Sequence, residues 1–330
     1  MSHSEGPRKS AFGNKPLRVA VVGVGYLGRF HAQKYQQINM VDFVGVCDQN
    51  AERVQKIATE LSVAHFQDYR DLLGRVDAVT IASTTLSHYS IARFFLENGV
   101  HVHVEKPMTS TVPEAEELVA LAKRNKLKLQ VGHVERFNSA LLAARENLLK
   151  PLFIECHRLA PFKPRGVDVN VVLDLMIHDL DVILSMVPSE VVSVSAVGTP
   201  VLTKTVDIAN ARIEFASGTV ANVTASRVSR NSVRKFRVFQ NNQYLSIDFG
   251  SGEVNLLTKT GEIENWENDN IPLEAQSWNL GKTDALLGET QSFVQSIVED
   301  HRPVVSGEDG LVALKLAEQI IVDIQRRLPQ

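Results

Sequence analysis

Short apolar runs alternate with longer segments of helical periodicity over the first 135 positions of the chain. The strand-like runs fall at residues 19–22, 41–47, 78–82, 100–104 and 127–131. Helical spacing covers residues 28–38, 51–61 and 88–98, and Thr111-Val-Pro-Glu114 forms a capping box that opens a further helix. Repeated strand–helix–strand connections of this kind indicate a doubly wound parallel sheet.

The pattern changes beyond about residue 150, where β-rich runs follow one another without helices between them. These runs cover residues 191–197, 207–215, 219–226, 235–239 and 244–249. Turn signals such as Ser217-Gly218 and Asn241-Asn242 separate some of them, which is typical of hairpins in an antiparallel sheet. Helices are predicted over residues 284–299 and 309–328. We therefore expect an α+β domain built on a large open, mostly antiparallel sheet.

Length and composition set the number of domains and narrow the possible partners. A chain of 330 residues fits a flexible tail (1–15) and two domains (16–135 and 136–330). Apolar residues make up 44% of the chain, charged residues 22%, and the formal net charge is −3. Such a balance gives no reason to expect nucleic acid or a membrane as a partner.

Compartment and redox state follow from three further features of the sequence. The polar N-terminus lacks the apolar core of a signal peptide, and no apolar run reaches eighteen residues. Only Cys47 and Cys156 are present, one in each expected domain. We therefore expect a cytoplasmic protein without a disulfide.

A glycine motif follows the first predicted strand and opens the first predicted helix. Its sequence is Gly23-Val24-Gly25-Tyr26-Leu27-Gly28. In a dinucleotide site the first glycine permits a tight turn, the second lets the backbone approach the pyrophosphate, and the third allows close helix–strand packing. The helix N-terminus then binds the phosphates. We expect a Rossmann domain that binds its cofactor through these residues.

Asp48, at the end of the second predicted strand, stands twenty residues after Gly28. An acid at this spacing binds the ribose hydroxyls of NAD. Alternatively, Asp48 is only the N-cap of the helix over residues 51–61. No pair of basic residues follows it directly, so the sequence favours NAD over NADP as the cofactor.

Two further groups of polar residues indicate chemistry. Glu105-Lys106-Pro107 follows the strand at 100–104, and the carboxyl edge of a parallel sheet is where ligands bind. Asp174 and His178 stand four residues apart in an apolar segment predicted to be a buried helix, so they share one face of it. The alternative is that Asp174 caps its own helix and that His178 is an ordinary buried histidine.

The three motifs, in this order and spacing, resemble those of the Gfo/Idh/MocA family of oxidoreductases over nearly the whole chain. The resemblance implies an NAD-binding domain over residues 16–135 and a substrate-binding and oligomerisation domain over residues 136–330. It also implies oxidation or reduction of one carbinol carbon of a sugar, sugar nucleotide or inositol with NAD(P). By family position, the resemblance also implies cofactor contacts from Ser83, Thr84, Glu105 and Lys106. His88 is expected near the nicotinamide side, where it either contacts the cofactor or has a structural role.

The family resemblance gives the site residues catalytic roles. His178 is the expected base for the hydroxyl proton, because an imidazole titrates near neutral pH. Lys106 would stabilise developing alkoxide charge, or act as the proton acceptor itself because the cationic nicotinamide disfavours a charged neighbour. Asp174 would orient the substrate or share the proton. The sequence leaves the division between these roles open.

Substrate identity rests on a closer resemblance within the family. Residues 131–138 and 158–165 are most similar to the branch that oxidises carbon 3 of UDP-N-acetylglucosamine. Arg158, Lys163 and Arg165 could face the diphosphate, although ordinary salt bridges explain arginines equally well. A free-sugar or inositol dehydrogenase is the alternative enzyme, and a non-catalytic NAD-binding regulator is the alternative from another class.

The remaining basic and histidine residues have simpler interpretations. His101 and His103 share a strand face, but neither a cysteine nor a third ligand is near them in sequence, so no metal site is expected. A basic run, Arg227, Arg230, Arg234, Lys235 and Arg237, suits a solvated sheet edge or a subunit interface. A large open sheet needs covering, so we expect a homodimer or homotetramer.

Overall fold

The computed structural model describes residues 15–163, 169–262, 272–281 and 283–328. The tail expected over residues 1–15 lies almost entirely outside them. The chain divides into two compact units. The first contains the described residues up to Val134 together with Leu286–Leu311, and the second contains Glu135–Ala285 and the described residues from Val312 onward. From the sequence, all of 136–330 was expected in the second domain, whereas Leu286–Leu311 belongs to the first unit.

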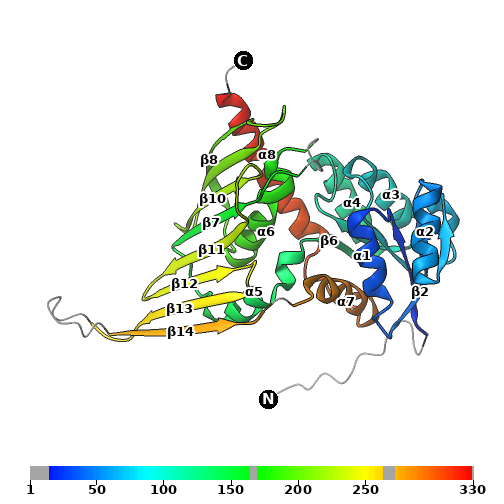
Figure 1. Cartoon of the computed structure of the whole chain (residues 1–330), viewed down its shortest axis with the longest axis horizontal. Helices are drawn as coiled ribbons and strands as arrows, with labels where there is room; N and C mark the ends of the chain where they lie inside the picture. Colours follow the sequence, from blue (N-terminus) through cyan, green and yellow to red (C-terminus); the bar gives the residue numbers. More distant parts are fainter. Residues whose placement is uncertain (1–14, 164–168, 263–271, 282, 329–330) are drawn as a thin grey trace. The chain divides into compact units, whose positions relative to one another are not determined.

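The first unit is built on a six-stranded, entirely parallel sheet in the order β3-β2-β1-β4-β5-β6. Figure 1 shows its helices around the strands. Its elements are β1 (Leu17–Val22), α1 (Tyr26–Tyr35), β2 (Val41–Cys47), α2 (Ala51–Leu61), β3 (Ala64–Phe66), η1 (Tyr69–Leu72), β4 (Ala78–Ile81), α3 (Thr85–Glu97), β5 (His101–Glu105), α4 (Val112–Asn125), β6 (Leu129–Gly132) and α7 (Ala285–Val298).

Apolar packing explains why residues so late in the chain belong to the first unit. Phe293, Val294 and Ile297 of α7 pack with Ala32 and Tyr35 of α1 in one buried cluster that also includes residues of β1 and α2. The helix 284–299 was predicted, but its apolar face did not reveal which sheet it covers. Strand β3 was missed because it has only three residues, none of them buried.

The second unit contains an eight-stranded sheet in the order β14-β13-β12-β11-β7-β10-β9-β8. Only the β7–β10 pair is parallel. Its elements are η2 (Val134–Phe137), α5 (Ser139–Ala144), η3 (Arg145–Asn147), β7 (Phe153–Leu159), η4 (Val172–Met176), α6 (Ile177–Met186), β8 (Val191–Thr199), β9 (Ile208–Phe215), β10 (Val220–Ser226), β11 (Val233–Gln240), β12 (Gln243–Asp248), β13 (Glu253–Lys259), β14 (Leu273–Asn279) and α8 (Gly307–Arg327), whose first turn belongs to the first unit.

Helices α5, α6 and α8 contribute to one apolar core against one side of this sheet. The other side carries polar residues, for example Asn210 and Arg212 of β9, which are exposed. Strand β7 was not predicted because Arg158 takes one of its buried positions. Strand β14 was missed because almost all its side chains are exposed at the sheet edge.

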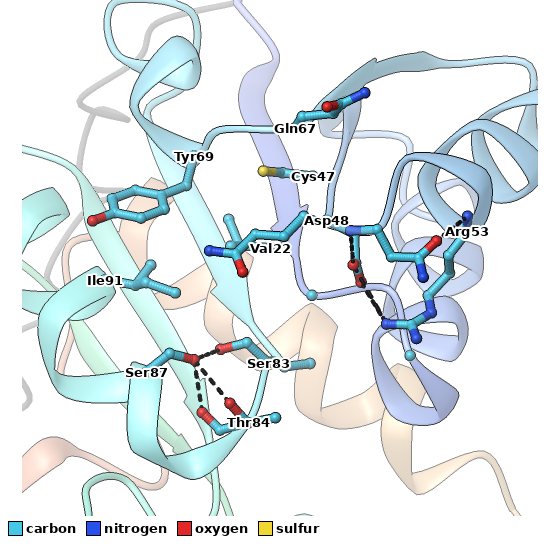
Figure 2. A pocket seen from close by; sticks show the side chains of 15 residues that line it. Val22, Cys47, Asp48, Arg53, Gln67, Tyr69, Ser83, Thr84, Ser87 and Ile91 are labelled. Carbon is cyan, nitrogen blue, oxygen red and sulfur yellow. Dashed lines mark hydrogen bonds and ion pairs between the residues drawn. The ribbon is translucent and has the colours of Figure 1, made fainter.

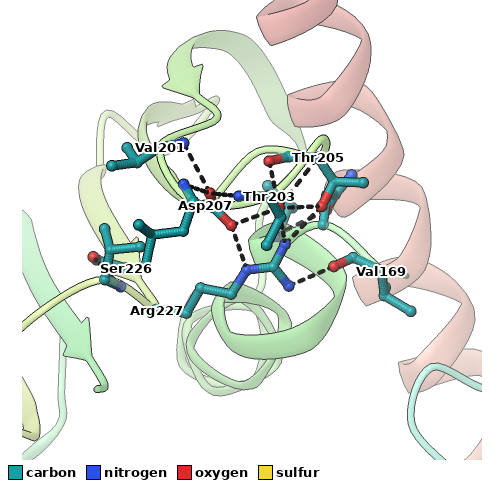
Figure 3. A network of polar contacts seen from close by, with 11 residues as sticks. Val169, Val201, Thr203, Thr205, Asp207, Ser226 and Arg227 are labelled. Carbon is teal, nitrogen blue, oxygen red and sulfur yellow. Dashed lines mark hydrogen bonds and ion pairs between the residues drawn. The ribbon is translucent and has the colours of Figure 1, made fainter. Parts of the chain in front are cut away.

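A buried polar network ties the loop after β8 to the segment before η4 (Figure 3). Asp207 accepts backbone N–H bonds from Val201, Leu202 and Thr203, and its other oxygen accepts Arg227 Nε at 2.8 Å. Arg227 also donates to the Val169 carbonyl oxygen at 2.7 Å. Arg227 is only 4% exposed, so the expectation of a solvated edge or interface is wrong for this member of the basic run.

The cysteines and the helices bear on two expectations from the sequence, the absence of a disulfide and the absence of a membrane span. Cys47 and Cys156 are both buried free thiols. Among the helices of the described residues, none is long and apolar enough to cross a bilayer.

Candidate functional site

The glycine loop between β1 and α1 has the conformation that the motif predicts. Gly23 adopts φ +86°, and a Cβ there would lie 2.5 Å from the Ser83 backbone nitrogen. A Cβ on Gly28 would overlap the Gly23 carbonyl oxygen, so the loop and helix pack in direct backbone contact. A Cβ on Gly25 would meet nothing within 4 Å. The loop is therefore closed toward the protein at Gly23 and Gly28 and open at Gly25, where a pyrophosphate needs access.

Helix α1 begins directly after this opening. Tyr26 and Leu27 lie in its first turn with 63% and 41% of their surfaces exposed, and the first turn contains no acidic side chain. The positive end of the helix dipole is therefore not neutralised from within this turn, which favours an anion at this position.

Asp48 lies at the end of β2, in a cavity of about 500 Å³ that borders the glycine loop (Figure 2). Its Oδ2 accepts the Val24 N–H at 3.0 Å, and its Oδ1 accepts the Asn50 N–H at 2.9 Å. Asn50, and not Asp48, is the N-cap of α2, because its side chain accepts the Arg53 N–H. The capping alternative for Asp48 is thereby removed. The cavity is lined by Val22, Gly23, Gly25, Cys47, Asp48, Gln49, Asn50, Arg53, Gln67, Tyr69, Ala82, Ser83, Thr84, Ser87 and Ile91.

Ser83 and Thr84, after β4, line the same cavity, and their contact with the cofactor stays a prediction. Thr84 is the N-cap of α3, and the Ser83 and Ser87 hydroxyl groups are 2.8 Å apart.

His88 is 1% exposed and is not among the residues lining the cavity. Its Nδ1 lies 2.9 Å from the Pro107 carbonyl oxygen and its Nε2 lies 3.2 Å from the Ser83 carbonyl oxygen. Burial lowers the pKa of His88, so a neutral ring donates to one of these carbonyls at a time. These contacts favour the structural alternative for His88, which links the cavity edge to the segment after Lys106.

Glu105 is the last residue of β5, and Lys106 follows it at the carboxyl edge of the sheet. Glu105 is 7% exposed, and its carboxylate faces the protein interior. Its Oε1 lies 2.8 Å from His31 Nε2, and its Oε2 accepts the Lys106 backbone N–H at 3.1 Å. The structure thus gives the Glu105 carboxylate internal partners, while Lys106 is half-buried at the edge.

Asp174 and His178 are both half-buried in the second unit, but the helix that carries them is not regular. Residues Val172–Met176 form a π-helical turn, and α6 continues from Ile177. The prediction of a plain α-helix is therefore corrected over Val172–Met176, which includes Asp174. Such turns occur frequently at functional sites. Asn170 begins the segment by accepting the Val172 and Leu173 N–H groups.

Arg158 has partners that the sequence did not reveal. Its Nε and Nη2 each donate to one oxygen of Asp179 at 2.8 Å, and its Nη1 donates to Glu135 at 2.9 Å. Burial opposes the charge of Arg158, but the two carboxylates outweigh burial and raise its pKa. Arg158 is 4% exposed, so we replace the expected diphosphate contact by a structural role: it holds α6, which carries His178, to β7.

Of the other two candidate diphosphate contacts, only Lys163 belongs to the described residues. Lys163 is exposed in the segment after β7. Arg165 lies outside the described residues. Three further residues near the site had no sequence signal: Arg53 in the cavity, His31 beside Glu105, and Glu289 of α7 near His103.

Each of the two units contains a segment that matches a model of a known protein family. Residues 17–133 match a family model described as an oxidoreductase family with an NAD-binding Rossmann fold. Residues 154–245 match the model of the GFO/IDH/MocA C-terminal domain. The fold and the cofactor cavity therefore define an NAD-binding oxidoreductase. The chain belongs to the GFO/IDH/MocA family, as the motifs predicted, and NAD is its cofactor class.

Individual relatives extend this comparison over nearly the full chain. A UDP-N-acetylglucosamine 3-dehydrogenase from Acidithiobacillus ferrooxidans is 39% identical over 313 residues, which are 94% of this chain and 97% of that protein. A solved structure of that enzyme aligns with a TM-score of 0.87 over 94% of this chain and 98% of its own, at 37% identity. A myo-inositol 2-dehydrogenase from Thermotoga maritima is 25% identical over 91% of this chain and 94% of its own.

Proposed function

We propose that this protein oxidises the carbon 3 hydroxyl of UDP-N-acetylglucosamine to a ketone and passes the hydride to NAD. The observation that supports the substrate most strongly is the 39% identity, over 94% of the chain, to a UDP-N-acetylglucosamine 3-dehydrogenase. The inositol dehydrogenase is more distant, at 25% identity.

The cofactor site of the first unit fits NAD in three respects. The open position at Gly25 admits a pyrophosphate, and the start of α1 favours its charge. Asp48 lies in the cavity where an acid is needed for the ribose hydroxyls. When bound, NAD supplies the hydride acceptor.

The chain's own residues carry the proton and orient the substrate in this proposal. His178 takes the proton of the carbon 3 hydroxyl as the C–H bond breaks, and Lys106 stabilises the negative charge that develops on that oxygen. Lys106 remains the alternative proton acceptor. Asp174 orients the sugar. Lys106 belongs to the first unit and the other two to the second, so their joint action is part of the proposal.

The diphosphate of the substrate needs cations. We assign this role to Lys163 and Arg165, since the guanidinium of Arg158 is bound to Asp179 and Glu135. Arginine suits phosphate oxygens because its planar fork donates two parallel hydrogen bonds.

The test incubates the purified protein with NAD and each of a panel of UDP-sugars, free sugars and inositols. The expected result is NADH formation with UDP-N-acetylglucosamine and a product two mass units lighter than the substrate. The absence of turnover with that substrate, together with good turnover of a free sugar or inositol, would transfer the assignment to the alternative enzyme. The absence of turnover with every alcohol, together with binding of NAD, would favour the non-catalytic regulator.

We also propose that the protein is a homodimer or homotetramer in the cytoplasm. The eight-stranded sheet carries a core on one side and exposed residues such as Arg212 on the other, which gives a second copy a surface to cover. Light scattering after size-exclusion chromatography would contradict the assembly if the mass were that of one 36.5 kDa chain.

A further inference from the structure

We propose that His31 of α1 is a positioning residue for Lys106 and that it acts through the carboxylate of Glu105. This inference rests on the proposed function, since it concerns the lysine to which we assign a role in the reaction. His31 lies in the helix that follows the glycine loop, 75 positions before Lys106 in the sequence, and no motif connects the two.

Hydrogen bonds form a continuous chain from His31 to the backbone of Lys106. His31 Nε2 is 2.8 Å from Glu105 Oε1, and Glu105 Oε2 accepts the Lys106 backbone N–H at 3.1 Å. Both oxygens of one carboxylate are therefore used, one toward α1 and one toward the residue that leaves the sheet edge. Because a carboxylate is rigid and planar, holding Oε1 restricts the positions that Oε2 can take.

Burial makes this arrangement stiff. The His31 side chain is 0% exposed and that of Glu105 is 9% exposed. Position 132 of the neighbouring strand β6 is glycine, and a Cβ there would lie 2.9 Å from Glu105 Oε2, so the carboxylate fits closely against the backbone. Burial alone would raise the pKa of Glu105, but the hydrogen bond and charge of His31 outweigh it and hold the pKa below its usual value. Glu105 is therefore ionised and held by a charge-assisted hydrogen bond.

The two side chains lie at the spacing of a hydrogen bond, which is shorter than the spacing of ligands in a tetrahedral zinc site. His31, Glu105 and Glu289 offer ligand atoms within 4.8 Å of one another, which is a possible spacing for a cation. The ligand atoms of a tetrahedral zinc site lie about 3.4 Å apart, as follows from bonds of about 2.1 Å. His31 Nε2 and Glu105 Oε1 are closer than that, at a hydrogen-bonding distance.

A positioning role predicts an effect on the chemical step that a purely structural role does not. Displacing a catalytic group by about 1 Å costs on the order of 10²-fold in rate. His31→Leu removes the donor and keeps an apolar side chain, whereas His31→Gln retains an N–H donor. The matched control is His101→Gln, since His101 lies at the other end of the same strand and its Nδ1 accepts the Lys128 N–H.

The experiment measures kcat, the KM for NAD and the deuterium isotope effect on kcat, with UDP-N-acetylglucosamine deuterated at the oxidised carbon. For folded His31→Leu we expect kcat to fall on the order of 10²-fold, with the KM for NAD changed less than about threefold and a larger isotope effect. His31→Gln should recover at least part of the loss, and His101→Gln should match the wild type. A folded His31→Leu with wild-type kcat would overturn the proposal, and so would a stoichiometric metal ion in the wild type.

Two further measurements keep the proposal separate from the proposed function and from misfolding. If His31→Leu does not fold, the double variant of His31→Gln with Glu105→Gln is compared with the two single variants. Residues that act as one unit give non-additive losses, so additive losses in kcat would overturn the proposal. If the wild type turns over no substrate, the proposed function fails, and crystal structures of the wild type and His31→Leu still test the positioning. An unmoved Lys106 backbone would then overturn the inference.

Discussion

Arg53 of α2 forms an ion pair with Asp48 at the end of β2, with 3.2 Å between Nη1 and Oδ2. Both side chains line the cofactor cavity (Figure 2). A cation is thus already present beside the acid that contacts the ribose hydroxyls of NAD in this type of site. Asp48 neutralises Arg53 and would repel a 2′-phosphate. While Asp48 is present, Arg53 is therefore not available to bind that phosphate.

The first prediction is that Asp48→Ser narrows the preference for NAD over NADP. The variant should weaken NAD binding and strengthen NADP binding, each on the order of tenfold, or about 1.4 kcal/mol. Arg53 becomes available to the 2′-phosphate when its carboxylate partner is removed. Dissociation constants for both cofactors provide the measurement, and Asp48→Ser with Arg53→Ala is the control that should lose the gain in NADP. A wild type that binds NADP more tightly than NAD would contradict the role of Asp48.

The second prediction separates chemistry from cofactor binding. Lys106→Ala and His178→Ala should each reduce kcat by roughly 10²-fold or more, the usual scale for a proton-transfer or electrostatic group. NAD affinity should change little in His178→Ala, because His178 belongs to the second unit. Steady-state kinetics and NAD titrations check both statements. Near-wild-type turnover in both variants would leave the proposed active site unsupported.

The third prediction concerns the stability of the helix that carries His178. Arg158→Met should destabilise the protein by about 3–5 kcal/mol, because it removes the buried cation that contacts both Asp179 and Glu135 and leaves Glu135 with the more distant Arg234, at 3.8 Å. Lys163→Met is the control, since Lys163 is exposed and a surface charge contributes little to stability. Denaturant unfolding measures both. Equal stability of the two variants would show that Arg158 does not hold α6.

The fourth prediction is a loss of stability in mild acid that depends on His103. Burial, followed by the charge of His31, lowers the pKa of His103 to about 3 from its usual value of 6.5. A group with a lowered pKa in the folded state contributes stability above its unfolded pKa and loses it as the pH falls toward the folded pKa. Unfolding free energy should therefore decrease from pH 6.5 to 3, by at most about 1.4 kcal/mol per pH unit for this proton. His103→Gln should show a shallower slope over this window, and an unchanged slope would exclude His103 as its source.

The sequence predicted the fold because apolar periodicity reports which face of an element is buried. It also singled out Gly23 and Asp48, which line one cavity in the structure, because a loop or strand end that binds a ligand uses residue types that are unusual there. The role of Lys106 stays a prediction. The sequence did not reveal the partners of those residues. His31 contacts Glu105 across 74 positions, and Glu289 reaches His103 from α7, so these contacts depend on tertiary packing. The role of Arg158 stayed open between a diphosphate contact and a salt bridge for the same reason, because a cation near a site has the same sequence signal whether it binds a ligand or a buried acid.

The last prediction uses the UDP group of the proposed substrate. Binding energy from a remote group can align the reacting part of a substrate, so removing that group lowers kcat as well as affinity. Free N-acetylglucosamine should therefore react with a lower kcat, in addition to a higher KM, than the nucleotide sugar. Arg165→Ala should raise the KM for UDP-N-acetylglucosamine and leave the kinetics of the free sugar unchanged, because the free sugar carries no diphosphate. NAD binding should also stay unchanged, because we assign the pyrophosphate of NAD to the glycine loop and the start of α1. Steady-state kinetics with both substrates provide the measurement, and equal kcat values for the two would show that the enzyme does not use the UDP group for alignment.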